Sequence, residues 1–136
     1  MKLSFPALFV ILASLVVIAA AGVGLMIVGG PGQARVQRFD DQRIEALRRL
    51  SSAVERDHAT RGAIPLTLEQ LALHQDGIEP AALRDPESGA AYDYRVTGLN
   101  SFELCATFAR PSRPDEAIRW RHQVGRTCFP LTVKSH

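Results

Sequence analysis

The sequence predicts an α+β protein: one N-terminal transmembrane helix, then a long amphipathic helix packed on a small antiparallel β-sheet. Three observations predict this order. Residues 3–33 contain no charged side chain. Apolar residues then recur at helical spacing over residues 34–58, and beyond Asp85 they alternate as in strands. A length of 136 residues fits an anchor over residues 1–33 and one soluble domain over residues 34–136.

The uncharged stretch near the N-terminus is long enough to span a bilayer. A hydrocarbon core of about 30 Å needs roughly 20 apolar residues in a helix, and no charge opposes insertion here. The alternative is a cleaved signal peptide, with Lys2 as its basic region and residues 19–21 as its cleavage site. The apolar run continues past these alanines to Val28. This length exceeds the apolar region of an ordinary signal peptide and favours a permanent anchor.

Two small residues in the span, Ala20 and Gly24, are four positions apart. A small-x-x-x-small pair lets two membrane helices approach closely. We therefore expect Ala20 and Gly24 to mark a contact with another membrane helix, although an alanine-rich span also produces such pairs by chance.

A long amphipathic helix follows the glycine- and proline-rich residues 29–32, where Pro31 suits a helix start. Its apolar residues fall on one stripe, which we expect to face the core. These residues are Val36, Phe39, Ile44, Leu47, Leu50 and Val54.

Helix signals continue after Gly62, which ends the long helix. Thr67 and Gln70 form a capping box that begins a short helix. Pro80 then suits the first position of one more helical turn, through Leu83. Three leucines are expected on the apolar side of the short helix: Leu68, Leu71 and Leu73.

The rest of the chain predicts four strands. Alternating apolar residues indicate strands over residues 92–96, 102–108, 118–122 and 127–129. Residues 98–101 close a hairpin between the first two. In the second strand, the residues from Phe102 to Phe108 alternate between a core face and a face that carries Cys105.

If the two predicted hairpins lie side by side, Cys105 and Cys128 face each other across neighbouring strands, and we expect them to form a disulfide. The bridge would close a loop of about 24 residues, worth roughly 3 kcal/mol. A lone even pair suits an oxidising compartment, while two buried free thiols are the alternative. The positive-inside rule points the other way, because Arg35, Arg38 and Arg43 follow the span and only Lys2 precedes it.

No catalytic or cofactor motif is present, so we expect neither enzyme activity nor a cofactor. A net charge of +2 gives no field that would recruit nucleic acid. The four histidines lack metal-ligand spacing, and His122 is interpreted as structural. Asp85, Glu87 and Asp93 are close in sequence, and a weak Ca²⁺ site there is an alternative that their sparse oxygen pattern disfavours.

Four sequence blocks carry a resemblance to a known group of proteins. They are residues 62–71 (GAIPLTLEQL), 85–94 (DPESGAAYDY), 102–108 (FELCATF) and 120–129 (WRHQVGRTCF). Over about residues 35–130 the chain resembles single-span bacterial membrane proteins of uncharacterised function, whose soluble part is pilin- or pseudopilin-like, as in type II secretion. The chain lacks the pilin features of a glycine before an aromatic start residue and a glutamate in the span. The resemblance therefore implies a pseudopilin-like fold and a periplasmic domain on an inner-membrane anchor, without polymerisation.

These observations lead to one functional expectation. The chain is expected to be a non-enzymatic, single-pass structural or accessory subunit of a larger membrane complex, with the lipid bilayer and other membrane subunits as partners. A pseudopilin-like component of a secretion or envelope system is the main alternative, and a small ligand-binding domain is a weaker one. We expect no nucleic acid and no small-molecule substrate.

Overall fold

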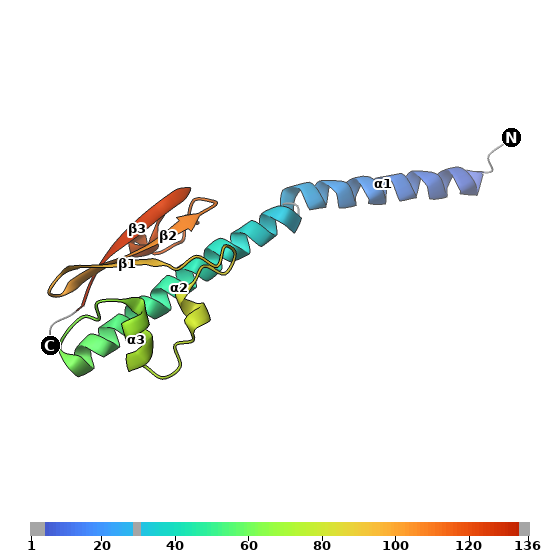
Figure 1. Cartoon of the computed structure of the whole chain (residues 1–136). Helices are drawn as coiled ribbons and strands as arrows, with labels where there is room; N and C mark the ends of the chain where they lie inside the picture. The colour runs from blue at the N-terminus through green and yellow to red at the C-terminus, as the bar shows by residue number, and fades with distance from the viewer. Residues whose placement is uncertain (1–4, 29–30, 134–136) are drawn as a thin grey trace. The chain divides into compact units, whose positions relative to one another are not determined.

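The computed structural model describes residues 5–28 and 31–133, and these have the α+β composition that the sequence predicts (Figure 1). The elements run in the order α1 (Phe5–Val28), α2 (Pro31–Arg61), α3 (Leu68–His74), the 3-10 turn η1 (Pro80–Leu83), β1 (Asp93–Gly98), β2 (Ser101–Phe108), the 3-10 turn η2 (Ile118–Trp120) and β3 (Gly125–Thr132). The chain divides into two compact units between Arg35 and Val36.

The first unit contains α1. Within this helix, Pro6–Met26 is long and apolar enough to cross a membrane, and none of that segment is buried in the structure. It is a single such segment among the described residues. A signal sequence also has this length and composition, so the permanence of the anchor remains a prediction.

The helix α2 belongs mainly to the second unit and places one face in the core. Ile44, Leu47, Leu50 and Val54 are buried as predicted, while Val36 and Phe39 are half-buried. The helix ends where Gly62 adopts a φ of 75°, and the Gly62 N–H donates to the carbonyl of His58 over 2.7 Å. A glycine just past the last helical residue is the usual way to reach this left-handed conformation.

The sheet is antiparallel with the order β1-β2-β3. Its middle strand alternates as predicted, with four buried residues on the face toward α2. They are Phe102, Leu104, Ala106 and Phe108. These side chains and the apolar residues of α2 belong to one hydrophobic core. The long helix and the sheet therefore stabilise each other, since neither can bury its apolar face alone.

The predicted strand over residues 118–122 is wrong. Residues 118–120 form η2, where the Trp120 N–H donates to the carbonyl of Ala117 over 2.8 Å. Trp120 and His122 are buried, which explains the alternating pattern, but Ile118 is 82% exposed. Local hydrogen bonds satisfy this backbone without a neighbouring strand, so the described sheet has three strands instead of four.

The short helix α3 begins at the predicted cap. The Gln70 N–H donates to Thr67 Oγ1 over 3.1 Å, while Gln70 Oε1 accepts from the N–H of Leu66 over 2.8 Å. Leu68 and Leu71 are buried as predicted, but Leu73 is 87% exposed. The prediction for Leu73 is wrong because this residue lies two positions after Leu71. Two positions amount to about 200° of helical rotation, which turns its side chain to the opposite face of α3.

Thr67→Ala is expected to destabilise the soluble unit by about 1 kcal/mol, because it removes the hydroxyl that accepts the Gln70 N–H. Urea unfolding of the full chain in detergent micelles, followed by the fluorescence of its single tryptophan, measures this change. Thr67→Ser keeps the acceptor and should unfold close to the natural protein. Equal loss in both variants would show that the cap contributes nothing.

Candidate binding groove

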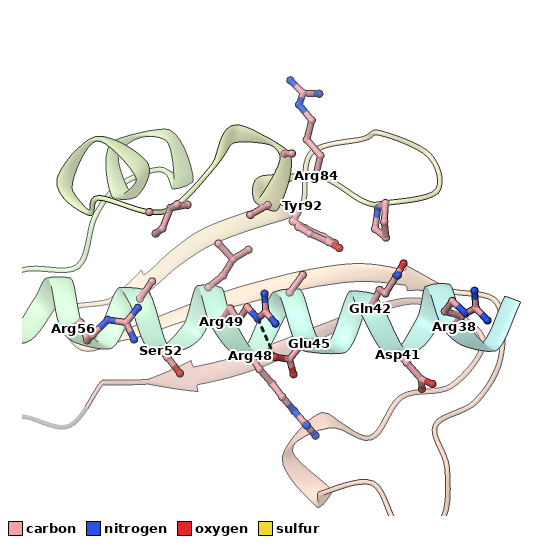
Figure 2. A pocket seen from close by; sticks show the side chains of 18 residues that line it. Arg38, Asp41, Gln42, Glu45, Arg48, Arg49, Ser52, Arg56, Arg84 and Tyr92 are labelled. Carbon is pink, nitrogen blue, oxygen red and sulfur yellow. Dashed lines mark hydrogen bonds and ion pairs between the residues drawn. The ribbon is translucent and has the colours of Figure 1, made fainter. Parts of the chain in front are cut away.

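An open groove of about 870 Å³ lies between α2 and the segment that runs from Gly77 to Tyr92 (Figure 2). We call it the α2 groove. On the α2 side it is lined by Arg38, Asp41, Gln42, Glu45, Ala46, Arg48, Arg49, Leu50, Ser52, Ala53 and Arg56. On the far side it is lined by Gly77, Ile78, Ala81, Ala82, Arg84, Pro86 and Tyr92. Residues far apart in the sequence therefore form the two walls.

Apolar and small residues make up much of this lining. Ala46, Leu50 and Ala53 come from α2, and Ile78 and Tyr92 come from the segment on the other side. A concave surface with apolar residues between polar edges is the usual form of a binding site.

Arginines give the α2 groove a net positive charge. Its two acidic residues are already paired: Asp41 with Arg113 at 2.5 Å and Glu45 with Arg49 at 3.0 Å. A further lining arginine, Arg48, pairs with Glu116. The groove therefore has no unpaired carboxylate of its own.

Three lining arginines have no carboxylate within ion-pair distance in the part of the chain that the structure describes: Arg38, Arg56 and Arg84. Arg56 reaches only the side-chain oxygen of Gln75, at 3.5 Å, and Arg84 donates to the carbonyl of Gly89 over 3.1 Å. All three are exposed. Figure 2 shows Arg38 and Arg56 on α2 at opposite ends of the groove, and Arg84 on the far wall.

A buried ion cluster holds the far wall against α2. The Arg43 guanidinium contacts Asp85 over 2.5 and 3.1 Å, Asp40 over 2.8 Å and Glu87 over 2.6 Å. We call these four residues the Arg43 cluster. Arg43, Asp40 and Asp85 are each at most 9% exposed. A guanidinium bound at two atoms by one carboxylate has little freedom to move, so the segment that follows Arg84 is fixed.

The same carboxylates also organise backbone at two loops. Asp85 Oδ1 accepts from the N–H groups of Glu87 and Ser88, over 2.9 and 2.8 Å. Asp40 accepts from the N–H groups of Ala109 and Arg110, just after β2, over 3.1 and 2.9 Å. The weak Ca²⁺ alternative grouped Asp85, Glu87 and Asp93, and this grouping is wrong because Asp93 has a different ion-pair partner from the other two. Asp85 and Glu87 neutralise Arg43, and Asp93 pairs with Arg126 elsewhere on the sheet.

The Arg43 cluster was not predicted from the sequence, where Arg43 was interpreted only as one of the positive charges that follow the membrane span. A signal was present. The apolar stripe of α2 has a gap of five between Phe39 and Ile44, and Arg43 stands at the position that continues the helical spacing from Phe39 to Leu47. A charge inside a core stripe implies a buried partner.

The pKa values follow from this geometry. Burial by itself would raise the pKa of Asp85, but the hydrogen bonds from Arg43 and from the Ser88 and Glu87 backbone outweigh it and lower that pKa to about 2. The hydrogen bond to Asp85, aided by those to Glu87 and Asp40, raises the pKa of Arg43 despite its burial.

Acid is expected to destabilise the soluble unit through Asp85. Because its folded pKa, about 2, lies below the unfolded value of 3.8, its contribution is present above pH 4 and is lost as the pH falls toward 2. The loss amounts to about 2 kcal/mol. Unfolding free energies of the full chain measured from pH 6 to pH 2 test this. Asp85→Asn should flatten the slope between pH 4 and pH 2, and Asp115→Asn, at an exposed site, should leave it unchanged. An unchanged slope in Asp85→Asn would contradict the assignment.

Tyr92 is the buried end of the groove lining. Its side chain is 6% exposed, and among the described residues its hydroxyl is a buried side-chain polar atom without a hydrogen-bond partner. Burial, followed by the nearby charge of Asp85, raises the pKa of Tyr92 to about 12. In Figure 2 the ring lies between α2 and the far wall.

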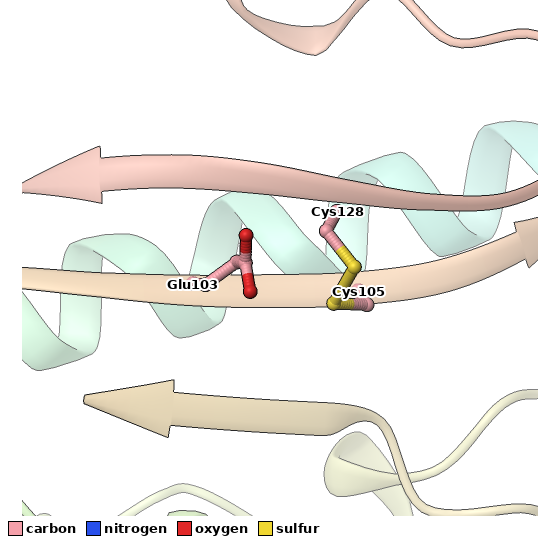
Figure 3. A group of neighbouring side chains, drawn as sticks. All are labelled: Glu103, Cys105 and Cys128. Atoms are coloured by element: carbon pink, nitrogen blue, oxygen red, sulfur yellow. A yellow bond between two sulfur atoms is a disulfide. The ribbon is translucent and has the colours of Figure 1, made fainter. Parts of the chain in front are cut away.

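The predicted cysteine pair lies on the outer face of the sheet. Cys105 and Cys128 are register partners on β2 and β3, with sulfur atoms 2.12 Å apart, the distance of a disulfide (Figure 3). The Glu103 carboxylate lies within 4.8 Å of both sulfurs. Sulfurs joined to each other offer no thiolate to a metal ion. Cys105 and Cys128 therefore form a structural crosslink, and the Glu103 carboxylate lies beside it.

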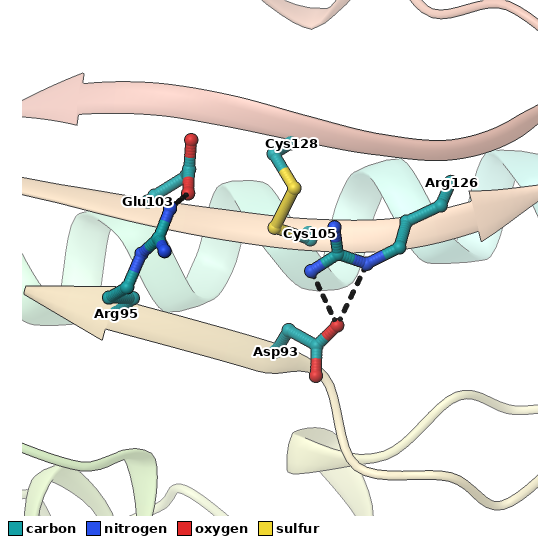
Figure 4. Close-up of a disulfide and its surroundings, with 6 residues drawn as sticks. All are labelled: Asp93, Arg95, Glu103, Cys105, Arg126 and Cys128. Atoms are coloured by element: carbon teal, nitrogen blue, oxygen red, sulfur yellow. Dashed lines mark hydrogen bonds and ion pairs between the residues drawn. A yellow bond between two sulfur atoms is a disulfide. The ribbon is translucent and has the colours of Figure 1, made fainter.

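Two ion pairs lie on either side of this disulfide (Figure 4). Arg95 pairs with Glu103 at 2.6 Å, and Arg126 extends from β3 to Asp93 on β1, over 3.0 and 3.1 Å. Cys105 is 5% exposed although it faces away from the core. The outer face of the sheet therefore presents balanced charges.

Two of the described histidines, His74 and His122, have local structural contacts. His122 stacks on Phe108 with ring centres 3.7 Å apart, and its Nδ1 lies 3.2 Å from the Trp120 carbonyl oxygen. His74 lies 3.2 Å from the buried carboxylate of Asp57, beside a hollow of about 240 Å³ that Thr60 also lines. The Thr60 hydroxyl donates to the Arg56 carbonyl instead of to a histidine, so this Asp–His pair has no activated nucleophile.

The two predicted membrane-contact residues lie on α1. Ala20 and Gly24 are exposed, and a Cβ added at Gly24 would meet no atom within 4 Å. The surface is thus open to a neighbour, and the helix contact remains a prediction.

Comparison with known proteins gives no match for this chain among family models, curated proteins or solved structures.

Proposed function

We propose that this chain is a non-enzymatic, single-pass membrane protein that serves as an accessory subunit of a larger membrane assembly and binds a partner subunit through the α2 groove. The observation that carries the proposal is the groove itself: an apolar lining, three arginines without carboxylate partners, and a wall fixed by the Arg43 cluster. The same chain carries a helix of membrane-spanning length. A tether to the bilayer concentrates a binding surface near other membrane proteins.

The proposed location is the inner membrane, with the soluble unit in the periplasm. The disulfide-bonded cysteine pair supports this side, since such bonds persist in oxidising compartments. The arginines that follow the span favour the opposite orientation. We give the disulfide more weight because the chain has no other cysteine.

A pseudopilin-like component of a secretion or envelope system is the second candidate. Its support is the order of elements, a long helix followed by a small antiparallel sheet, together with the resemblance of the four sequence blocks. The two candidates differ in assembly, because a pseudopilin would associate with further pilin-like subunits, and an accessory subunit would migrate with one defined complex.

Solubilisation of native membranes in a mild detergent tests the proposal. The full chain is expected to co-migrate with a large complex on gel filtration and to remain with it after affinity purification. Migration at the size of one chain in a micelle would contradict an accessory role.

Contact inside the bilayer has its own test. Ala20→Leu with Gly24→Leu should reduce co-migration, because leucine side chains keep two helices apart. Gly22→Leu is the matched control: it lies about 200° around the helix from both residues, and an added Cβ there meets no atom within 4 Å. Equal behaviour of the double variant and the control would contradict the contact.

A further inference from the structure

We infer that the α2 groove binds an acidic amphipathic helix of a partner subunit. This inference rests on the proposed function and names the chemistry of the partner.

The shape of the α2 groove suits a helix. Its α2 wall runs from Arg38 to Arg56, which is about 27 Å or five helical turns. Small residues on both walls let another backbone approach closely, and the exposed or half-buried ones are Ala46, Ala81 and Ala82. An amphipathic helix would bury its apolar stripe on these alanines and on the half-buried Ile78, above the buried floor of Leu50 and Ala53.

The charges select an acidic partner. Arg38 and Arg56 bracket the α2 wall, Arg84 lies on the far wall, and none of them has a carboxylate partner within the described residues. Acidic side chains along a partner helix would meet Arg38 and Arg56 beside α2, and one on its other flank would meet Arg84, whose side chain extends away from α2 (Figure 2). Contacts of this kind steer association and weaken with added salt.

A second copy of this chain fits the groove poorly. Within the described residues, α1 contains no acidic residue, α2 buries its apolar stripe in its own core, and α3 has only seven residues. None of these offers an exposed apolar stripe with acidic flanks. The observations therefore favour a different chain as occupant.

Site-specific photocrosslinking in native membranes tests the inference. The full chain carries benzoylphenylalanine at Gln42 on α2, whose side chain extends toward the far wall (Figure 2), or at Ala82 on the far wall, both exposed in the groove. Mass spectrometry identifies the crosslinked peptide. We expect one peptide of another protein from both positions, with acidic residues flanking an apolar helical stripe. The control position is Thr107, exposed on the outer face of the sheet, and it should not capture that peptide.

Charge removal gives the matched comparison. Replacing the three unpaired arginines with glutamine should lower the crosslinking yield about tenfold, since three exposed ion pairs of about 0.5 kcal/mol each are lost. The control triple variant removes the same charge outside the groove, at Arg110, Arg119 and Arg121, and should retain the yield within about twofold. Far-UV circular dichroism of both triple variants verifies that they are folded, because Arg119 lies 5.9 Å from the centre of the Trp120 ring and its replacement changes the tryptophan fluorescence directly.

The outcomes separate the two proposals. Capture of a second copy, of lipid or of a basic or neutral peptide would overturn the acidic-helix inference, and so would equal yields in the two triple variants. Co-migration with a large complex without any groove crosslink would also overturn it, while leaving the accessory role in place. Solitary migration in mild detergent would overturn the accessory role itself.

Discussion

Arg43→Met is expected to destabilise the soluble unit by about 3–5 kcal/mol. The change removes the one cation that, among the described residues, pairs with the carboxylates of Asp40 and Asp85, which stay 3% and 9% exposed. A buried charge that loses its partner keeps its desolvation penalty and gains nothing in return. The free energy of unfolding of the full chain in micelles, followed by the fluorescence of buried Trp120, measures the loss.

Arg49→Met is the matched control for Arg43→Met. Both arginines lie on α2, but the pair of Arg49 with Glu45 is exposed on both sides, with side chains 78% and 53% accessible. An exposed pair of this kind contributes at most about 0.5 kcal/mol. If the two variants unfolded at the same denaturant concentration, the Arg43 cluster would not be the element that fixes the far wall.

Loss of the disulfide should cost about 3 kcal/mol. Cys105 and Cys128 are 23 positions apart in the sequence, and a crosslink across a loop of this size restricts the unfolded chain by roughly that amount. Cys105→Ser with Cys128→Ser should lower the free energy of unfolding accordingly. Adding a reductant should lower the stability of the natural protein by a similar amount.

The double serine variant is also the control for reduction. A reductant should leave its stability unchanged, because it has no disulfide to break. Stability of the natural protein that did not respond to a fully reducing buffer would contradict a structural role for the crosslink. Trapping of free thiols by alkylation in intact cells would further contradict the oxidising compartment.

The sequence predicted well those elements that a short-range pattern determines. The stripe from Ile44 to Val54 identified the core face of α2, and the alternation from Phe102 to Phe108 identified β2. The pairing of the cysteines depended on β2 lying beside β3, in a register that places Cys105 opposite Cys128. For α2 and β2, residues close in the sequence carry the whole signal, and the core then reinforces it.

The wrong predictions concern the strand over residues 118–122 and the burial of Leu73. Ile118 to His122 alternate like a strand, yet local hydrogen bonds and contacts of Trp120 and His122 with core aromatics explain the alternation. Leu73 is apolar like Leu68 and Leu71, but helical rotation turns it to the exposed face of α3. Period alone cannot tell a strand from an irregular segment that buries every second residue.

The α2 groove was not predicted because its walls come from distant parts of the chain. Ala53 lies on α2 and Ile78 on the far wall, and the Arg43 cluster holds Asp85 and Glu87 of the far wall against α2. The arginines are evident in the sequence, but the sequence does not indicate which of them form an ion pair with a carboxylate. That depends on tertiary contacts, such as those of Arg113 with Asp41 and Arg126 with Asp93.

Alkaline carbonate extraction of native membranes tests most directly whether Pro6–Met26 holds the chain in the bilayer. We expect the chain to stay in the membrane pellet, and we expect mass spectrometry to recover peptides of this segment from the pellet. Release of the chain into the supernatant, or a mature chain that begins after Ala21, would contradict the anchor and with it the proposed membrane assembly.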